Sequence, residues 1–483
     1  MRFHNTLTRT VEDFVPSDGT IVTLYSCGPT VYDYAHIGNL RKYLFDDTLR
    51  RALMSQGYEV KHVVNITDVG HLTSDADSGQ DKLEKGAASS GQTVWEVAER
   101  FTIAFKADMA ALNVLPPSVN PDRSQNKKQS DAYARATDFV AEQIQMIQLL
   151  KDRGFVYQTD EAMYFEVAKL PNYGALSGQA LADKETGARD NVVTDGNKRS
   201  PHDFAVWFFI MGHFADHTMH WPSPWGEGFP GWHLECSAII HATLGDPIDI
   251  HTGGVDHIGT HHPNEMAQTE GAYGHALSRF WLHSQFVVGN GVKMSKSTGN
   301  TAKLSDLMAD GVSPLAYRLL CLQAHYRSEL SFTPESLTAA QNTLLGLYGW
   351  ADLRHQIGLS EVQLGPGHVQ AFLARMRAHL ADDLGTPKAL AELYRFMLEL
   401  SPGMRYDDED FEELLGGLDA LLGLDMKGRA DSTDEVKALL AERQAAREVR
   451  DYAQSDTLRN KLRKRGYDVD DTPNGPRWRR ITG

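Results

Sequence analysis

The chain has 483 residues, of which 41% are apolar, so it is long enough for several packed domains and too apolar to be disordered. No apolar run approaches the roughly eighteen residues of a membrane span, and no charged start precedes an apolar stretch, so we expect neither a membrane helix nor a secretory signal. The formal net charge of -16 argues against a nucleic-acid-binding surface spread over the whole molecule.

The first predicted elements form one βαβ unit. β-branched residues over 20–25 predict a short buried strand, which is followed by a turn at Cys27-Gly-Pro29. Apolar residues at helical spacing predict a helix over about 36–56, and a second strand is expected over 59–66. A strand, a crossover helix and a second strand imply a parallel sheet.

A later strand is predicted over 247–251, where it enters a turn at Gly253-Gly254. The long mixed segment before it predicts an insertion at 113–228. The interrupted nucleotide-binding domain would then comprise residues 1–112 and 229–330.

Beyond residue 330 the pattern becomes helical. Thr333-Pro334 and Thr386-Pro387 both read as a capping hydroxyl followed by proline, and leucines and alanines at helical spacing predict a bundle over 331–425. Polar, glycine-containing residues 426–433 predict an exposed linker.

The last module, 426–483, is predicted to contain a helix over 435–452 and a short tail punctuated by proline and glycine. It carries 14 lysines and arginines against 10 aspartates and glutamates, so it is basic on an acidic body. Such a module could bind phosphates, although a solvated helical face of mixed charge explains the composition equally well.

Two short motifs suggest phosphate chemistry. His36-Ile-Gly-Asn39 opens the first helix, where a glycine lets a nucleotide approach the backbone and the helix N-terminus favours phosphate; alone, an ordinary helix cap is the simpler reading. Lys293-Met-Ser-Lys296-Ser297 places two lysines beside small hydroxyl residues, which suits a loop that binds triphosphate better than a random basic surface loop. The fingerprint G-x-G-x-x-G does not follow the first strand, which argues against a dehydrogenase.

The chain has three cysteines, too few for a disulfide framework, which fits a reducing cytoplasm. Two of them, Cys27 and Cys236, together with His261 and Glu265 offer the donor atoms of a zinc site. Each also has a structural reading: a buried cysteine often serves as a small apolar residue, and a histidine and glutamate four apart on a helix can simply hydrogen-bond.

The two phosphate motifs resemble the HIGH and KMSKS motifs of class I aminoacyl-tRNA synthetases in order and separation. Longer strings narrow the resemblance to cysteinyl-tRNA synthetases. These strings are spread over nearly the whole chain, in the family's order: Tyr25-Ser-Cys-Gly-Pro-Thr-Val-Tyr-Asp33, Asn65-Ile-Thr-Asp68, Phe229-Pro-Gly-Trp-His-Leu-Glu-Cys-Ser237, His261-His-Pro-Asn-Glu265 and Asp471-Thr-Pro-Asn-Gly-Pro-Arg-Trp478.

The resemblance implies a Rossmann-type catalytic domain with an insertion, an α-helical bundle and a small anticodon-binding domain. It implies activation of L-cysteine with ATP and transfer to tRNA(Cys), with Mg²⁺ accompanying ATP. One Zn²⁺ would be held by Cys27, Cys236, His261 and Glu265 and would bind the substrate thiolate.

The resemblance also implies residue roles in the pocket. The catalytic positions would be His36, Asn39, Lys293 and Lys296. Gly28, Thr67 and Trp232 would line the amino-acid pocket, and Gly254 and Asp256 would lie at the ATP ribose.

The chain departs from the family pattern at several places. Asn39 replaces the second histidine of the first motif and can donate a hydrogen bond but cannot carry charge. Pro263 stands where glutamate is common, residues 253–260 differ from the usual Gly-Gly-Ser-Asp-Leu-Met-Phe-Pro, and Thr67-Asp-Val-Gly-His71 lacks the usual acidic run. These departures indicate a divergent subgroup.

By the same resemblance the C-terminal module reads the anticodon through Arg447, Tyr452, Asp456 and Asp471, with Tyr452 in place of a tryptophan that can stack on a base.

We expect a monomer in the cytoplasm. Two rival functions remain: a ligase that joins cysteine to an amino sugar, which should lack the tRNA-reading end, and a non-catalytic paralogue, which should have lost His36 or Lys296.

Overall fold

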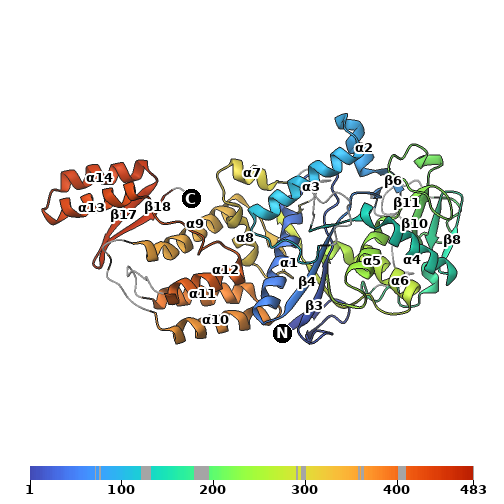
Figure 1. Ribbon diagram of the computed structural model, residues 1–483, viewed down its shortest axis with the longest axis horizontal. Coiled ribbons are helices and arrows are strands. Elements are labelled where there is room, and N and C mark those ends of the chain that lie inside the picture. The colour runs from blue at the N-terminus through green and yellow to red at the C-terminus, as the bar shows by residue number, and fades with distance from the viewer. Residues whose placement is uncertain are drawn as a thin grey trace.

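The computed structural model describes residues 1–70, 72–74, 78–120, 132–178, 195–289, 292–294, 301–356, 359, 364–400 and 409–481. Figure 1 shows a central sheet domain with a smaller α/β lobe at one end and a helical bundle followed by a small C-terminal module at the other. The active-site residues predicted above belong mostly to the central domain.

The central sheet has five strands, all parallel, in the order β13-β12-β3-β4-β7. Its strands are β3 (Ile21–Ser26), β4 (Glu59–Ile66), β7 (Ala134–Arg135), β12 (Ile248–Gly254) and β13 (Ser278–Ser284). The predicted parallel sheet is thus confirmed. Because Thr252 of β12 lies opposite Ser26 of β3, the carboxyl end of the first strand of the βαβ unit meets a strand from far along the chain.

The crossover helix α1 (Ile37–Ser55) begins one residue after His36 and is buried on almost every side. It packs against β4, α8, α10 and α12. Charged residues are therefore buried along with apolar ones; they are Arg41, Lys42, Asp46, Asp47, Arg50 and Arg51.

The lobe beside the sheet is built on an antiparallel sheet of order β11-β10-β9-β8. These strands are β8 (Val156–Gln158), β9 (Ala162–Phe165), β10 (Phe204–Phe209) and β11 (Gly228–Pro230), and helix α4 (Val140–Asp152) packs beside them. Strand β7 falls within the segment predicted as an insertion, yet it pairs with β4 at the edge of the central sheet.

Further helices and strands complete the part of the chain before the bundle. The helices are α2 (Lys82–Ser90), α3 (Val94–Ala111), α5 (Trp232–Thr243), α6 (His261–Tyr273), α7 (Leu304–Ala309) and α8 (Pro314–Leu322). The strands are β1 (Arg2–Asn5), β2 (Thr10–Asp13), β5 (Leu72–Ser74), β6 (Ser78–Asp81), β14 (Val287–Gly289), β15 (Val292–Lys293) and β16 (Leu330–Ser331).

The helical bundle comprises α9 (Pro334–Ala351), α10 (Pro366–Ala381), α11 (Thr386–Glu399) and α12 (Glu409–Leu422). The predicted start at Thr333 is confirmed, since its side chain accepts a hydrogen bond from the Ser336 amide. The prediction for Thr386 is wrong in detail: Gly385 occupies the cap and Thr386 is the first helical residue, because the chain enters α11 through a tight turn.

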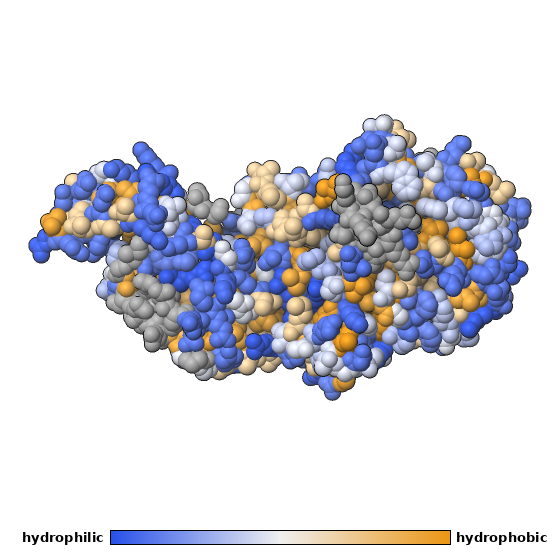
Figure 2. Space-filling model, in the orientation of Figure 1, coloured by the Kyte–Doolittle hydropathy of each residue, from blue (hydrophilic) through white to orange (hydrophobic). Residues whose placement is uncertain are grey.

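The C-terminal module contains α13 (Asp434–Glu448), α14 (Tyr452–Lys464) and an antiparallel hairpin of β17 (Tyr467–Thr472) and β18 (Gly475–Arg480). The helix predicted over 435–452 is observed as α13, but it ends at Glu448, because Arg450 adopts a φ of 61° and Asp451 caps a second helix, α14, that was not predicted. The predicted irregular tail is the hairpin, which buries Trp478 against both helices. Polar residues predominate on the visible face of this module (Figure 2).

The predicted exposed linker at 426–433 is in fact anchored to the bundle. Met426 is fully buried, and the Arg429 guanidinium pairs with the buried Asp352 carboxylate at 2.8 Å. The Gln356 side chain donates to the Trp478 carbonyl at 3.0 Å and accepts from the Trp478 amide at 2.9 Å. The bundle therefore binds the C-terminal module through specific polar contacts.

Candidate active site

A pocket of about 400 Å³ opens at the carboxyl ends of β3, β4 and β12. This is the edge at which parallel α/β sheets usually bind ligands. The pocket wall includes nearly all the described residues predicted to bind substrate: Gly28, His36, Asn39, Thr67, Trp232, Gly254 and Asp256. Residues predicted for the amino acid and for ATP therefore share one cavity.

The first phosphate motif forms the N-terminus of α1. The His36 ring nitrogen Nδ1 accepts a hydrogen bond from the Asn39 amide at 3.3 Å, and the Asn39 side-chain oxygen accepts one from the His36 amide at 3.2 Å. This reciprocal capping gives a structural reason for asparagine at position 39. Between them, Gly38 could not carry a side chain without approaching the His36 ring within 2.9 Å.

The second phosphate motif reaches the same pocket through Met294, which lines it. The Lys293 backbone belongs to β15 and pairs with Val288 of β14. Lys296 lies outside the described residues.

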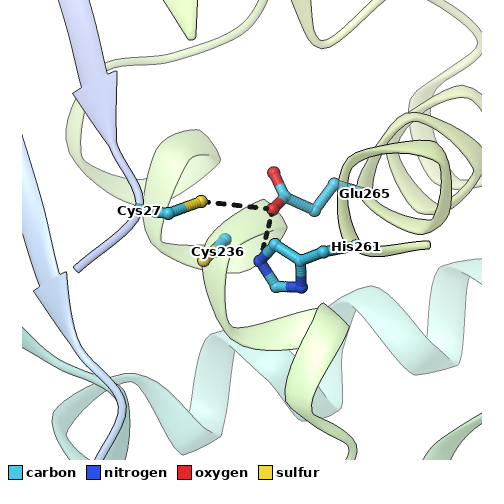
Figure 3. A group of neighbouring side chains, drawn as sticks. All are labelled: Cys27, Cys236, His261 and Glu265. Carbon is cyan, nitrogen blue, oxygen red and sulfur yellow. Dashed lines mark hydrogen bonds and ion pairs between the residues drawn. The ribbon is translucent and has the colours of Figure 1, made fainter. Parts of the chain in front are cut away.

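The four predicted metal ligands converge on one another (Figure 3), and Cys27, Cys236 and His261 also line the pocket. Cys27 follows β3, Cys236 lies on α5, and His261 and Glu265 lie one turn apart on α6. Their ligand atoms are all within 4.8 Å of one another, and all four residues are buried. The Glu265 Oε1 atom lies 2.7 Å from His261 Nε2 and 3.8 Å from Cys27 Sγ. Two sulfurs, one nitrogen and one carboxylate oxygen in this arrangement fit a zinc ion.

The electrostatics of the metal-free cluster favour one thiolate, at Cys27, beside a protonated His261; a bound metal would take the place of the His261 proton and of the Cys236 proton. Burial opposes charge on Cys27, but the Cys236 thiol and the neighbouring histidines outweigh it and hold the pKa of Cys27 well below its ordinary value. Burial raises the pKa of Cys236. Burial also opposes charge on His261, yet the Glu265 carboxylate raises the pKa of His261 to about 10. A thiolate is the form of cysteine that binds metal.

Further histidines surround these four residues, and sequence reasoning gave them no role. His251 Nε2 lies 2.6 Å from Glu265 Oε2, and His233 and His261 approach through their Nδ1 atoms at 2.9 Å. His262 Nε2 lies 3.4 Å from Cys27 Sγ. Cys27, His251, His262 and Glu265 form a second possible ligand set, but it shares two residues with the first. The abundance of histidine between 233 and 283 was the available sequence signal.

The amino-acid side of the pocket is tightly packed. The Gly28 amide donates to the Asn65 side-chain oxygen at 2.6 Å, and a Cβ at Gly28 would lie only 1.6 Å from the Asn65 carbonyl oxygen. The Thr67 hydroxyl donates to Glu235 at 2.7 Å, and burial raises the pKa of Glu235 well above its ordinary value. The Trp232 ring stacks on His261 with ring centres 4.3 Å apart.

In the C-terminal module, three of the four predicted anticodon residues lie together. Arg447 pairs with Asp471 at 3.1 Å and lies over the Tyr452 ring, whose residue is 57% exposed. Asp471 is also bound by both terminal nitrogens of Arg443, at 2.9 and 2.8 Å. Asp456 lies on the exposed side of α14.

Residues 13–342 match the family model described as the tRNA synthetases class I (C) catalytic domain, and residues 429–479 match the cysteinyl-tRNA ligase anticodon binding domain. Solved structures share the fold at low identity. A methionyl-tRNA synthetase of Mycobacterium tuberculosis with methionyl-adenylate aligns with a TM-score of 0.58 at 14% identity, covering 85% of this chain and 93% of that one. The chain thus has the fold of a class I tRNA synthetase and, by the family match over more than half of its length, belongs to that class.

Relatives that match over nearly their full length show which family within this class the chain belongs to. Cysteine–tRNA ligase 1 of Burkholderia lata is 45% identical, covering 99% of this chain and 96% of the relative. A cysteine–tRNA ligase of Treponema denticola is 38% identical over all of both chains. The chain belongs to the cysteine–tRNA ligase family. Along the described part of the chain, none of the helices is long and apolar enough to cross a membrane.

Proposed function

We propose that this chain activates L-cysteine with ATP and transfers it to the 3′ end of tRNA(Cys). The observation that carries the proposal is the group of Cys27, Cys236, His261 and Glu265, three of whose members line the pocket. This donor set suits recognition of a thiol, and family membership supplies the reaction. The amino-sugar ligase is disfavoured by the matched anticodon-binding segment at 429–479.

The four ligands would hold one Zn²⁺, which when bound supplies a thiophilic centre for the sulfur of cysteine and not for the hydroxyl of serine. Packing alone distinguishes near-isosteres by only about 1–3 kcal/mol. A metal–thiolate bond would therefore allow selection without an editing site. Gly28, Thr67 and Trp232 would enclose the rest of the amino acid.

In the first step the cysteine carboxylate attacks the α-phosphorus of ATP, the bond to the β-phosphate oxygen breaks, and pyrophosphate leaves with its Mg²⁺. His36, Lys293 and Lys296 would stabilise the charge that develops on the phosphate, and Asn39 would donate a hydrogen bond without adding charge. Gly254 and Asp256 would bind the ribose. In the second step a hydroxyl of the terminal tRNA ribose attacks the activated carbonyl and AMP leaves.

Arg447, Tyr452, Asp456 and Asp471 would contact the anticodon. Their stacking and charge suit single-stranded bases beside phosphates. A monomer located in the cytoplasm remains our prediction.

Amino-acid-dependent ATP–pyrophosphate exchange, measured with each of the twenty amino acids, tests the proposal. We expect exchange with cysteine alone, and aminoacylation of tRNA(Cys) but not of other tRNAs. Exchange with another amino acid, or cysteine activation without any tRNA charging, would contradict it.

A further inference from the structure

Helix α1 carries an ion pair in its buried middle. The Lys42 Nζ atom lies 2.8 Å from Asp46 Oδ2, and the two side chains are only 10% and 4% exposed. Removing two charges from water costs several kcal/mol for each ion, and Coulomb attraction alone often fails to offset it. The pair therefore calls for a function beyond holding the helix.

Lys42 also reaches the metal-binding cluster. Its ammonium donates a hydrogen bond to the Cys27 carbonyl at 2.5 Å, and Lys42 lines the active-site pocket. On the other side of the same residue, the Cys27 amide donates to the Thr252 carbonyl of β12 at 3.3 Å. The backbone of this predicted ligand is thus fixed by one strand and by one lysine.

Asp46 joins the lysine to the two central strands. Its Oδ1 atom accepts from the Thr252 hydroxyl at 2.7 Å, which lies 2.8 Å from the Ser26 hydroxyl. The Ser26 hydroxyl in turn lies 2.9 Å from His62 Nε2. The Thr252 hydroxyl has one hydrogen, which it donates to Asp46. The Ser26 hydroxyl must therefore donate to the Thr252 oxygen and accept from His62 Nε2. The hydrogen bonds therefore run in one direction, from β4 through β3 and β12 to the carboxylate.

We propose that Lys42 and Asp46 are positioning residues for Cys27, which they hold at the distance from the N-terminus of α1 that cysteine activation needs. The inference rests on the proposed function. The same helix carries His36 and Asn39 at its start, where ATP would bind. Lys42 therefore connects this end of α1 to Cys27, which would lie beside the thiol of the substrate cysteine. Lys42 acts through the backbone of Cys27 and is not itself a metal ligand.

The decisive variant is Lys42→Met/Asp46→Leu, which removes both charges and leaves neither partner buried alone. We expect it to fold, to bind zinc at least tenfold more weakly in competition with a chelator, and to show an altered visible spectrum with Co²⁺ in place of zinc. In cysteine-dependent ATP–pyrophosphate exchange, the KM for cysteine should rise at least tenfold, while the KM for ATP stays within twofold.

Thr48→Val is the matched control. Thr48 is buried on the same helix, and its hydroxyl donates at 2.7 Å to the Leu44 carbonyl of that helix, away from Cys27. It should keep the zinc affinity and the KM for cysteine of the unaltered chain. Asp46→Asn provides a second, milder variant with the same shape, for which we expect a three- to tenfold loss of zinc affinity.

Unchanged zinc affinity and cysteine KM in the double variant would overturn the positioning role, as would equal losses in Thr48→Val. Should the double variant not fold, unchanged values in Asp46→Asn would overturn it as well. Failure of the proposed function would look different, because the unaltered chain itself would then show no cysteine-dependent exchange.

Discussion

At the residue scale, the closest packing around the pocket is at Gly28. Gly28→Ala would place a Cβ 1.6 Å from a backbone oxygen of β4, which no rotamer change can relieve. We expect a loss of roughly 1–3 kcal/mol in the free energy of unfolding and a sharp rise in the KM for cysteine. Chemical denaturation and pyrophosphate exchange measure the two effects.

The control for this prediction is Gly346→Ala, in the exposed part of α9 with open space around it. Alanine there should raise the free energy of unfolding by about 0.5–1 kcal/mol. A Gly28→Ala protein as stable and as active as the unaltered chain would contradict the packing argument.

Cys27 supports a second prediction at this scale. Cys27→Ser removes one sulfur from the cluster, so zinc content and cysteine affinity should fall together, by roughly 100-fold or more. Elemental analysis and cysteine titration check it. Cys321→Ser is the control, since burial raises the pKa of the Cys321 thiol to about 11 and it lies outside the cluster. Full zinc content in Cys27→Ser would refute the assignment.

Residue types and short strings were enough to predict the four ligands, and the structure brings them together. The ion pair of Lys42 and Asp46 was not predictable in the same way. A lysine and an aspartate four apart on a helix usually mark a solvated face. Here Lys42 and Asp46 instead contact Cys27 and Thr252 at the ends of β3 and β12, and β12 lies about two hundred residues further along the chain.

At the scale of elements, the C-terminal hairpin is bound to α14 by the Asp468 carboxylate as well as by apolar packing. Asp468 accepts from Arg459 at 2.9 Å and from Arg463 at 3.1 Å. The hydrogen bond from Arg463, with that from Arg459, holds the pKa of Asp468 well below its ordinary value. Asp468→Asn should therefore destabilise the module by roughly 1–3 kcal/mol near neutral pH.

The sign of the pH dependence follows from the lowered pKa. The carboxylate's contribution is complete above the unfolded-state pKa of about 4 and is lost as the pH falls toward the folded-state value. Hydrogen exchange across 434–480 should show the variant and the unaltered chain converging below about pH 4. Asp470→Asn, which removes a mostly exposed pair with Arg479, should cost at most about 1 kcal/mol. Equal effects of the two substitutions would contradict this account.

Sequence periodicity predicted strand β4 at its observed bounds and α1 within a residue or so, because local pattern and cap agree there. It missed the hairpin because Pro473 and Pro476 suggested an irregular tail. Proline lacks the amide donor of a strand, yet Pro476 is tolerated opposite Asp471 at the end of a two-stranded ribbon. The break before α14 was missed because it depends on the positive φ of a single arginine.

At the scale of the whole molecule, the predicted activation and tRNA-reading functions lie at separate places along its length (Figure 1). A chain ending at Asp431 removes α13, α14 and the hairpin but keeps the pair of Arg429 with Asp352. We expect it to fold and to activate cysteine at a near-normal rate. It should charge tRNA poorly, and the salt dependence of tRNA binding should be shallower, because the lost module is basic.

A chain ending at Asp425 is the matched comparison. It also loses Arg429 and leaves the Asp352 carboxylate buried without that partner. It should therefore unfold at a lower temperature than the chain ending at Asp431. If the chain ending at Asp431 charges tRNA(Cys) as efficiently and selectively as the full chain, the C-terminal module does not read the anticodon.

The order of strands in the central sheet has a consequence for the chain as it leaves the ribosome. Strands β3 and β4 are made early and can pair at once, but the other edge of β3 stays open until β12 has been made, more than two hundred residues later. During that interval the four strands of the lobe can pair with one another, although their apolar core is completed only by Leu234 of α5 and by Ala267 and Ala272 of α6. Cys27 is made long before Cys236, His261 and Glu265, and the metal site is complete only when all four are present. We therefore expect metal uptake to be a late event in biosynthesis. Nascent chains arrested before residue 236 should retain no zinc, and those long enough to expose residue 284 outside the ribosome should retain it.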